Sequence, residues 1–218
     1  YNYGYYSTEL NIVPDVSSWD TSSVTHMNNM FSEYGHNSTI LNAVPDVSSW
    51  DTSNVTGMNS MFYCYGYCST ELNAVPDVSG WVTSNVTDIS SMFRDYGYCS
   101  TALNAVPDVS GWDTSKVTNI SLMFNSYGSD STVLDFVLDL SDWNMSNVTS
   151  YDSTFAFAGA NARRWSVRIP DMTGDYTNDA THWYVGNGEG YIKPESGRNF
   201  KVGSDTPDFI AVCDTTND

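Results

Sequence analysis

Four cysteines are the most reactive side chains in this chain of 218 residues. They are Cys64, Cys68, Cys99 and Cys213, and they match no spacing of zinc ligands. Paired cysteines are typical of proteins in oxidising compartments, so the four residues favour disulfide chemistry. Cys68 and Cys99 stand at equivalent positions of a repeat described below, which favours a bond between them. Other pairings stay open, among them Cys64 with Cys68, while Cys213 is free, bonded to Cys64 or bonded to another molecule.

Aspartates recur in a regular series and are the candidate metal ligands. The series is Asp15, Asp46, Asp77, Asp108 and Asp139. Stacked carboxylates at Asp46, Asp77 and Asp108 would offer calcium the several oxygen atoms that it prefers, which makes calcium a candidate cofactor. The alternative is that each aspartate caps a turn by accepting hydrogen bonds from nearby backbone N–H groups. The sequence contains no Asp-rich loop of known ligand spacing, and no other cofactor is predicted.

The sequence lacks the usual signatures of catalysis. His26, His36 and His182 occupy unrelated positions, and no G-x-S-x-G, H-E-x-x-H or phosphate-binding loop occurs. The polar residues instead recur once per repeat, whereas an active site is normally a single constellation. We therefore expect a protein that is not an enzyme.

Six asparagines stand in Asn-X-Ser/Thr sequences, which accept N-glycans in secreted eukaryotic proteins. They are Asn37, Asn54, Asn85, Asn119, Asn144 and Asn147. Asn54, Asn85 and Asn147 share a repeat position with Lys116, so this position is expected to face solvent. These three are the preferred candidates for glycosylation. The alternative is that their side chains serve the local turn.

A repeat of 31 residues organises all these positions. Its clearest marker is the series Trp19, Trp50, Trp81, Trp112 and Trp143, which contains no insertion. Each unit reads close to Y-G-x-x-S-T-x-L-N-x-V-P-D-V-S-x-W-D-T-S-x-V-T-x-M-x-x-M-F. Such a unit cannot bury its apolar face alone, so about five units over residues 1–159 are predicted to stack into a solenoid with parallel strands.

Each unit is predicted to contain one strand-like segment and one short helix or helical turn. Residues 41–47 are rich in β-branched side chains, which favour an extended chain. Pro45 lacks a backbone donor and belongs at a strand start or a bend. Residues 55–62 carry apolar side chains at helical spacing, with Thr56 as a candidate N-cap and Gly66 as the end of the helix.

The segment W-D-T-S-N-V-T-G-M-N-S-M-F at residues 50–62 resembles the repeats of the BspA-like leucine-rich-repeat surface proteins. The resemblance extends over residues 3–155. It implies a secreted or wall-attached protein linked to adhesion, with a sheet on one face. The predicted fold is therefore an α/β repeat solenoid of leucine-rich-repeat type, with parallel strands and a short helix or helical turn in each unit.

Residues 160–218 fall outside the repeat. Trp183–Val185 and Tyr191–Ile192 read as strands separated by glycine-rich turns, which predicts a β-rich C-terminal cap or docking segment. Six of the eight basic residues gather in this segment. They are Arg163, Arg164, Arg168, Lys193, Arg198 and Lys201.

The balance of charge excludes several classes of partner. The chain has 8 basic and 26 acidic residues and a net charge of −18, which would repel nucleic acid and anionic lipid. No apolar run approaches the roughly 18 residues that a membrane span requires. Neither nucleic acid nor a membrane span is therefore expected.

Two functions remain, and both place the protein outside the cell or on its surface. The first is a structural protein in which the acidic repeats of one copy meet the basic C-terminal segment of the next, forming a fibre or surface layer. The basic residues named above are the candidates for this contact. The second is a monomeric adhesin module that binds a glycan or a host surface protein.

Overall fold

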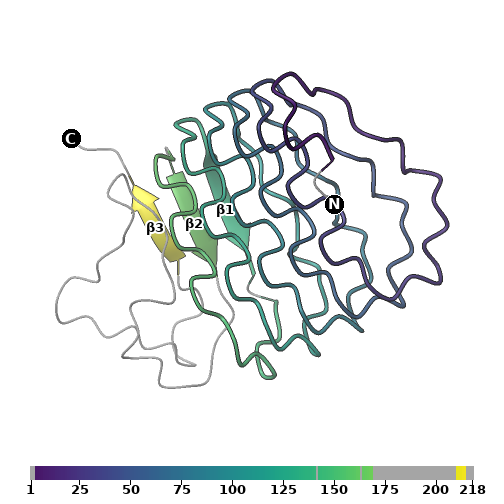
Figure 1. Cartoon of the computed structure of the whole chain (residues 1–218). Coiled ribbons are helices and arrows are strands. Elements are labelled where there is room, and N and C mark those ends of the chain that lie inside the picture. Colours follow the sequence, from purple (N-terminus) through teal and green to yellow (C-terminus); the bar gives the residue numbers. More distant parts are fainter. Residues whose placement is uncertain (1–2, 141, 163, 169–209, 215–218) are drawn as a thin grey trace.

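The computed structural model describes residues 3–140, 142–162, 164–168 and 210–214. Over the repeats the chain winds through successive turns of similar shape, and each turn lies against the next (Figure 1). One turn corresponds to one sequence unit, because contacts between turns join positions that are 31 residues apart, as between Thr56 and Thr25.

Backbone hydrogen bonds hold the turns together. The N–H of Thr87 donates to the carbonyl of Thr56 at 2.9 Å, and the N–H of Thr118 donates to the carbonyl of Thr87 at 2.9 Å. Parallel bridges lie beside these bonds and pair His26 with Gly57, Gly57 with Asp88, Asp88 with Asn119, and Asn119 with Ser150. Neighbouring turns therefore run parallel and in a constant register.

The C-terminal part of the described chain contains three strands: β1 (Asp135–Asp139), β2 (Arg164–Arg168) and β3 (Ile210–Asp214). They form one sheet in the order β1-β2-β3 (Figure 1). β1 and β2 pair in parallel, whereas β3 pairs antiparallel with β2. The strands predicted at residues 183–185 and 191–192 lie outside the described residues.

β1 forms in the unit that has lost its proline. Leu138 stands where the four preceding units carry Pro14, Pro45, Pro76 and Pro107. A proline has no N–H to donate to a neighbouring strand. The described residues of those four units contain no strand at this position. The strand expected in every unit is therefore restricted to the fifth.

An asparagine side chain supplies the missing pairing beside each proline. The N–H of Asn42 donates to Oδ1 of Asn11 at 2.8 Å, and the N–H of Asn73 donates to Oδ1 of Asn42 at 2.8 Å. The series ends where Asp135 donates its N–H to Oδ1 of Asn104 at 3.0 Å. A side-chain carbonyl thus substitutes for a backbone carbonyl between turns.

The segment predicted to be a short helix or helical turn differs in the structure. The described residues contain no helix, and residues 59–68 form consecutive turns. Ser60 and Cys64 have left-handed backbones, with φ of 57° and 53°. Alternate N–H groups donate to the next turn, as from Phe62 to Met92 at 2.9 Å. These bonds take the donors that a helix would use within itself, so the apolar spacing serves stacking and not a helix.

Identical side chains stack into columns through the core. The ring centroids of Tyr65 and Tyr96 lie 5.4 Å apart with an angle of 10° between the ring planes. Those of Trp81 and Trp112 lie 6.3 Å apart, at 7°. Leucine, valine, methionine and phenylalanine columns fill the remaining interior. Burial of these apolar columns is the main stabilising term for the stacked turns.

The polar atoms of these columns are also paired across turns. Nε1 of Trp81 donates to the carbonyl of Val47 at 3.0 Å, and the hydroxyl of Tyr96 donates to the carbonyl of Ala74 at 2.7 Å. Because buried donors are costly when unpaired, each of these bonds fixes its side chain in one position.

We predict that Gly97→Ala destabilises the stack by about 1–2 kcal/mol, because Gly97 has a left-handed backbone that disfavours a Cβ. The added atom would also lie 3.2 Å from Leu103 and 3.3 Å from Leu72. Urea unfolding followed by circular dichroism measures the change. Gly111→Ala is the matched control, since a Cβ added at Gly111 would have no atom within 4 Å beyond its chain neighbours. Equal losses for the two variants would contradict the prediction.

Candidate functional site

The first turn leaves one end of the aromatic columns uncovered. Trp19 is 52 % exposed, whereas the equivalent Trp50 and Trp81 are 4 % exposed. Tyr3 is 63 % exposed, whereas the equivalent Tyr65 is fully buried. Each inner ring is covered by rings of two neighbouring turns, but Trp19 stacks on Trp50 alone among the described residues, with centroids 6.1 Å apart. In the described chain, Trp19 and Tyr3 therefore form an exposed aromatic surface.

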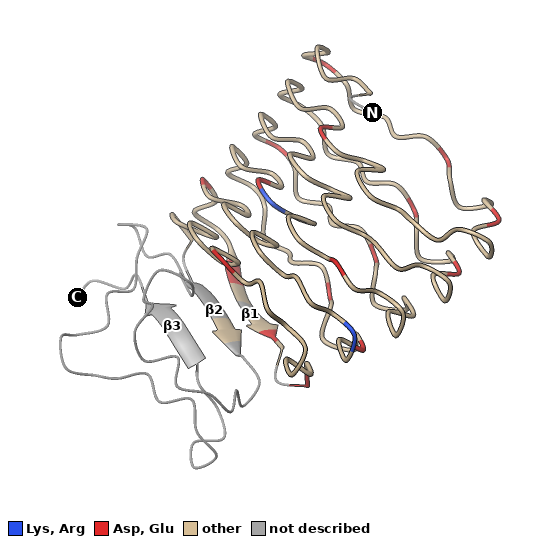
Figure 2. Cartoon of the chain, turned by 60° about the horizontal axis from the view of Figure 1, so that its bottom comes forward, with Lys and Arg blue, Asp and Glu red and all other residues tan. Residues whose placement is uncertain are grey.

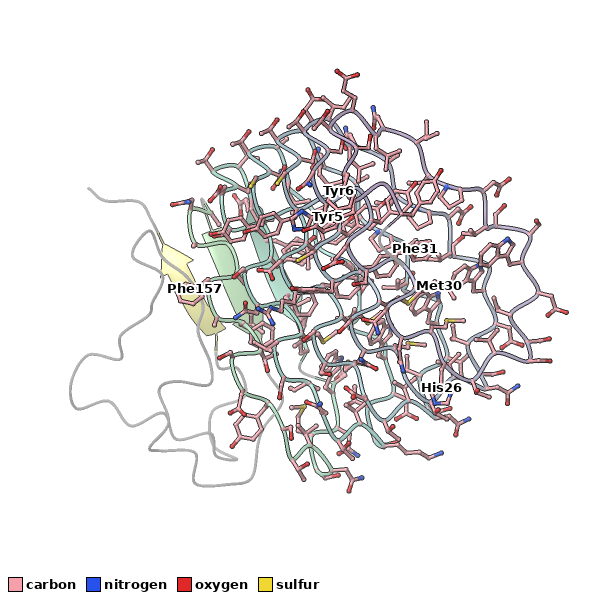
Figure 3. The ribbon with its side chains drawn as sticks, viewed as in Figure 1. Tyr5, Tyr6, His26, Met30, Phe31 and Phe157 are labelled. Carbon is pink, nitrogen blue, oxygen red and sulfur yellow. The ribbon has the colours of Figure 1, made fainter. Side chains whose placement is uncertain are left out.

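Two more apolar side chains of the first turn enlarge this surface. Ile12 is exposed and stands where the next three units carry Ala43, Ala74 and Ala105. Tyr6 is exposed and contacts the ring of Tyr5 edge-on, with centroids 4.8 Å apart (Figure 3). We call Tyr3, Tyr6, Ile12 and Trp19 the end face. Tyr6 and Ile12 differ from their counterparts in the next three units, whereas Tyr3 and Trp19 recur in every unit.

The backbone of the first turn has an open edge as well. The N–H of Thr39 donates to the carbonyl of Thr8 at 3.0 Å, and the N–H of Thr56 donates to the carbonyl of Thr25 at 2.8 Å. Within the described chain, Thr8 and Thr25 have no preceding turn to which their own N–H groups could donate in this way. An open backbone edge beside apolar rings is a ready surface for pairing with another chain.

Acidic residues recur along the successive turns, whereas basic residues are few in the repeats (Figure 2). Asp46 is exposed, and its Oδ1 accepts the N–H of Ser48 at 3.1 Å and the hydroxyl of Ser48 at 2.7 Å. These two bonds hold the pKa of Asp46 below its ordinary value, and the charge of Asp15 opposes the shift weakly. Asp77 and Asp108 hold Ser79 and Ser110 in the same way.

The aspartates predicted as calcium ligands thus cap turns in the structure. Each of Asp46, Asp77 and Asp108 uses one carboxylate oxygen for its own turn. Over the described ranges, no three His, Cys, Asp or Glu side chains are grouped so as to hold a metal ion. The pairing of each carboxylate with its serine supports the turn-capping alternative.

A second region combines positions that differ between units, and we call it the variable edge. It consists of the two residues before and the two residues after the Tyr-Gly pairs of the second to fifth units, namely residues 32–33, 36–37, 63–64, 67–68, 94–95, 98–99, 125–126 and 129–130. The tyrosines and glycines between them repeat unchanged, and the tyrosines are buried in the core. The side chains of the variable edge are therefore not dictated by the repeat.

A charged cluster occupies the middle of the variable edge. Nε of Arg94 lies 3.1 Å from Oδ2 of Asp95, and the guanidinium lies 5.4 Å from the ring centroid of Tyr63. The thiol of Cys64 also donates to Asp95, at 3.8 Å. Burial raises the pKa of Asp95 above its ordinary value despite the attraction of Arg94, and burial raises the pKa of Cys64 to about 12. Cys64 is therefore a neutral thiol at physiological pH.

Aromatic rings stack beside this cluster. The rings of His36 and Tyr67 lie 4.7 Å apart, and those of Tyr67 and Tyr98 lie 4.8 Å apart. All three residues are half-buried. Of the other histidines, exposed His26 contacts the hydroxyl of Thr25 at 3.0 Å through Nδ1, and His182 lies outside the described residues.

The cluster of Arg94, Asp95, Cys64 and Tyr63 was not predicted from the sequence. Its members are ordinary residues that match no motif. The signal that marks them is variation between units at positions flanked by constant ones, which singles out residues free of the demands of the core.

A family comparison identifies the chain. The model described as "Mycoplasma protein of unknown function, DUF285" matches residues 4–95 and again residues 67–182. The chain belongs to the DUF285 family. The two overlapping matches agree with a repeated unit in this DUF285 protein. No curated protein and no solved structure matches the chain.

The glycosylation candidates of this DUF285 protein have defined surroundings. Asn54 is exposed and donates Nδ2 to the carbonyl of Ser22 at 2.8 Å. Asn85 is half-buried and Asn147 is exposed, and each donates Nδ2 to a carbonyl in the same way. The Nζ of Lys116 donates to Oδ1 of Asn85 at 2.7 Å. These asparagines bond to the preceding turn of the solenoid and not within their own local turn, which differs from the alternative, while their glycosylation stays a prediction.

The other three acceptors occupy local turns. Half-buried Asn37 contacts Nδ1 of His36 at 2.9 Å through Oδ1. Oδ1 of Asn119 and Oδ1 of Asn144 each accept the N–H of the serine two residues later, at 3.0 Å. Asn144 is exposed and Asn119 is half-buried.

Two basic residues of the predicted docking segment, Arg164 and Arg168, lie in β2. The register of the sheet places them opposite Asp135 and Asp139 of β1. The remaining candidates lie outside the described residues, namely Arg163, Lys193, Arg198 and Lys201.

Of the cysteines in the variable edge, Cys64 precedes a Tyr-Gly pair, whereas Cys68 and Cys99 each follow one. Cys64 is buried, whereas Cys68 and Cys99 are half-buried and neighbour one another in adjacent turns. All three are free thiols in the structure. Cys213 lies in β3, opposite Trp165 in the register.

A search for membrane-spanning helices finds none of sufficient length and apolarity in the part of the chain that the structure describes.

The hydrogen bonds by which the aspartates cap their local turns predict that the protein loses stability in acid. Hydrogen bonds to serine lower the pKa values of Asp15, Asp46 and Asp51 in the folded chain. A carboxylate with a lowered folded pKa stabilises the fold above its unfolded pKa, and this contribution is lost as the pH falls from about 4 toward the lowered value. The urea midpoint should therefore fall steadily between about pH 5 and pH 2.

Ser48→Ala tests the cause at one position. It removes the hydroxyl donor, so the pKa of Asp46 should rise toward its ordinary value in a carboxyl NMR titration. Asp113, which holds Ser115 in another turn, is the internal control and should not move. An unchanged pKa of Asp46 would contradict the assigned cause.

Proposed function

We propose that this chain is an extracellular structural protein, built as a leucine-rich-repeat-like solenoid, that self-assembles head to tail into a fibre or surface layer. The role is not catalytic, because its polar residues recur once per turn. The resemblance of its repeats to BspA-like surface proteins supports a place outside the cell or on its surface.

The pairing of each turn with the next is the observation that carries this proposal. In the end face of the described chain, Tyr3 and Trp19 are exposed in columns whose inner members are buried, and Ile12 of the same turn is also exposed. A second copy placed against this face would cover the rings and pair the open backbone edge. A contact between two different surfaces of the same chain repeats without closing and makes a filament.

Charge supports the same polarity of assembly. Residues 1–160 hold two basic residues, Arg94 and Lys116, whereas the C-terminal segment holds the other six. These six basic residues are the candidates for the contact with the acidic repeats of the next copy. If charge dominates this contact, salt should weaken the assembly, and insensitivity up to about 1 M salt would remove the electrostatic part.

Removing the exposed ring should weaken self-association. We predict that Trp19→Ala lowers the sedimentation-velocity fraction of assembled protein at least tenfold, because the central aromatic residue of an interface commonly contributes about 2 kcal/mol or more. Electron microscopy of the same samples should show fibres for the unsubstituted chain and none for the variant.

Val82→Asp is the matched control for this experiment. Val82 is as exposed as Trp19 but lies on a turn in the middle of the stack, where the equivalent Asp51 and Asp113 are acidic. It should assemble like the unsubstituted chain. Equal assembly by Trp19→Ala, or single short rods for the unsubstituted chain, would overturn the proposal.

The variable edge favours a second function, that of a monomeric adhesin module that binds a glycan or a host surface protein. Tyr63, Arg94 and the ring stack are of the residue types that dominate binding energy at interfaces. Under this alternative Arg94→Ala lowers binding to a cell surface and the chain stays monomeric. Loss of assembly without loss of binding separates the two functions.

A further inference from the structure

Cys68 and Cys99 take the same place in two neighbouring turns of the variable edge. The N–H of Cys68 donates to the carbonyl of His36 at 2.9 Å, and the N–H of Cys99 donates to the carbonyl of Tyr67 at 2.9 Å. The preceding rings, Tyr67 and Tyr98, stack 4.8 Å apart with an angle of 8° between their planes. Both cysteines are thus held in register at the spacing of adjacent strands, about 5 Å, which lies within the Cα separation of disulfides.

The two thiols are also placed to react with each other. The Cys68 thiol is near enough to Cys99 to affect its ionisation, and both residues are half-buried, so a small oxidant can reach them. Burial, together with the neighbouring Cys68 thiol, raises the pKa of Cys99 to about 11. Oxidation that starts from the Cys99 thiolate should therefore accelerate as the pH rises.

Cys64 is placed differently. It is buried, and its thiol donates to Asp95 in the next turn. The equivalent residues in the neighbouring turns are Glu33 and Asp95, so no cysteine follows or precedes Cys64 in its own column. The structure thus distinguishes two of the pairings that the sequence left open.

We propose that Cys68 and Cys99 are a site of oxidative modification, at which a disulfide cross-links two neighbouring turns. As the Sγ–Sγ bond forms, the two thiols lose two protons and two electrons. Oxidised glutathione accepts both and leaves as two molecules of reduced thiol, by way of a mixed disulfide. The proposal concerns a contact within one chain, so it does not depend on self-assembly.

The cross-link would enclose one complete repeat unit, from Cys68 to Cys99. The two joined turns could then separate only after reduction, which restrains the unfolded chain and stabilises the fold. The cluster of Arg94, Asp95 and Tyr63 belongs to the same two turns. Oxidation would thus hold this part of the variable edge in one arrangement.

Peptide mapping of the full chain tests the pairing. The reduced protein is incubated with oxidised glutathione, free thiols are blocked with iodoacetamide, and chymotryptic peptides of the monomeric band are analysed by mass spectrometry. The expected result is a linked peptide that contains Cys68 and Cys99, with Cys64 alkylated. The oxidised form should melt about 5 °C or more above the reduced form.

Three variants complete the experiment. Cys64→Ser should retain the linked peptide, whereas Cys68→Ser and Cys99→Ser should each abolish it. A bond from Cys68 or Cys99 to Cys64 or Cys213 in the unsubstituted chain would overturn the proposal, and so would the absence of any bond. Because the mapping of the unsubstituted chain decides the pairing, a variant that folds poorly does not affect the outcome.

Discussion

The constant register between neighbouring turns is the constraint on which the rest of the structure depends. Backbone bonds such as that from Thr87 to Thr56 place equivalent residues over one another. Because the units have equal length, every side chain meets its own counterpart, and the tyrosine and tryptophan rings stack in continuous columns. An insertion of one residue would shift all columns at once, so the equal spacing of the tryptophans is a physical requirement of the packing.

A stack that buries its core in this way necessarily has two ends. Inner turns cover each other, but the ring of Trp19 has a neighbour on one side in the described chain. At β2 the parallel order changes, because β3 pairs antiparallel with it. Within the described chain, the first turn and the C-terminal strands therefore offer different surfaces, as the proposed head-to-tail contact requires.

Function on such a scaffold belongs to the positions that the columns leave free. Asp46 recurs because it caps a local turn, and Asn54 recurs because it bonds to the preceding repeat. Their repetition therefore reflects structure more than ligand binding. Arg94, Asp95 and Cys68 vary from unit to unit and lie where side chains can differ without disturbing the core. The family match adds the repeat itself but assigns no activity, so these positions and the end face carry the functional proposals.

The sequence by itself determined the repeat, its period and many of the residues that face the core, because a period and an apolar pattern are local properties. It also located Pro45 at a place that disfavours a strand. Only the tertiary structure decided that residues 59–68 form turns and not a helix, because their N–H groups bond to the next turn. It alone brought Arg94 to Tyr63 and Cys64 to Asp95, since these contacts between turns join residues that are distant in the chain and match no motif.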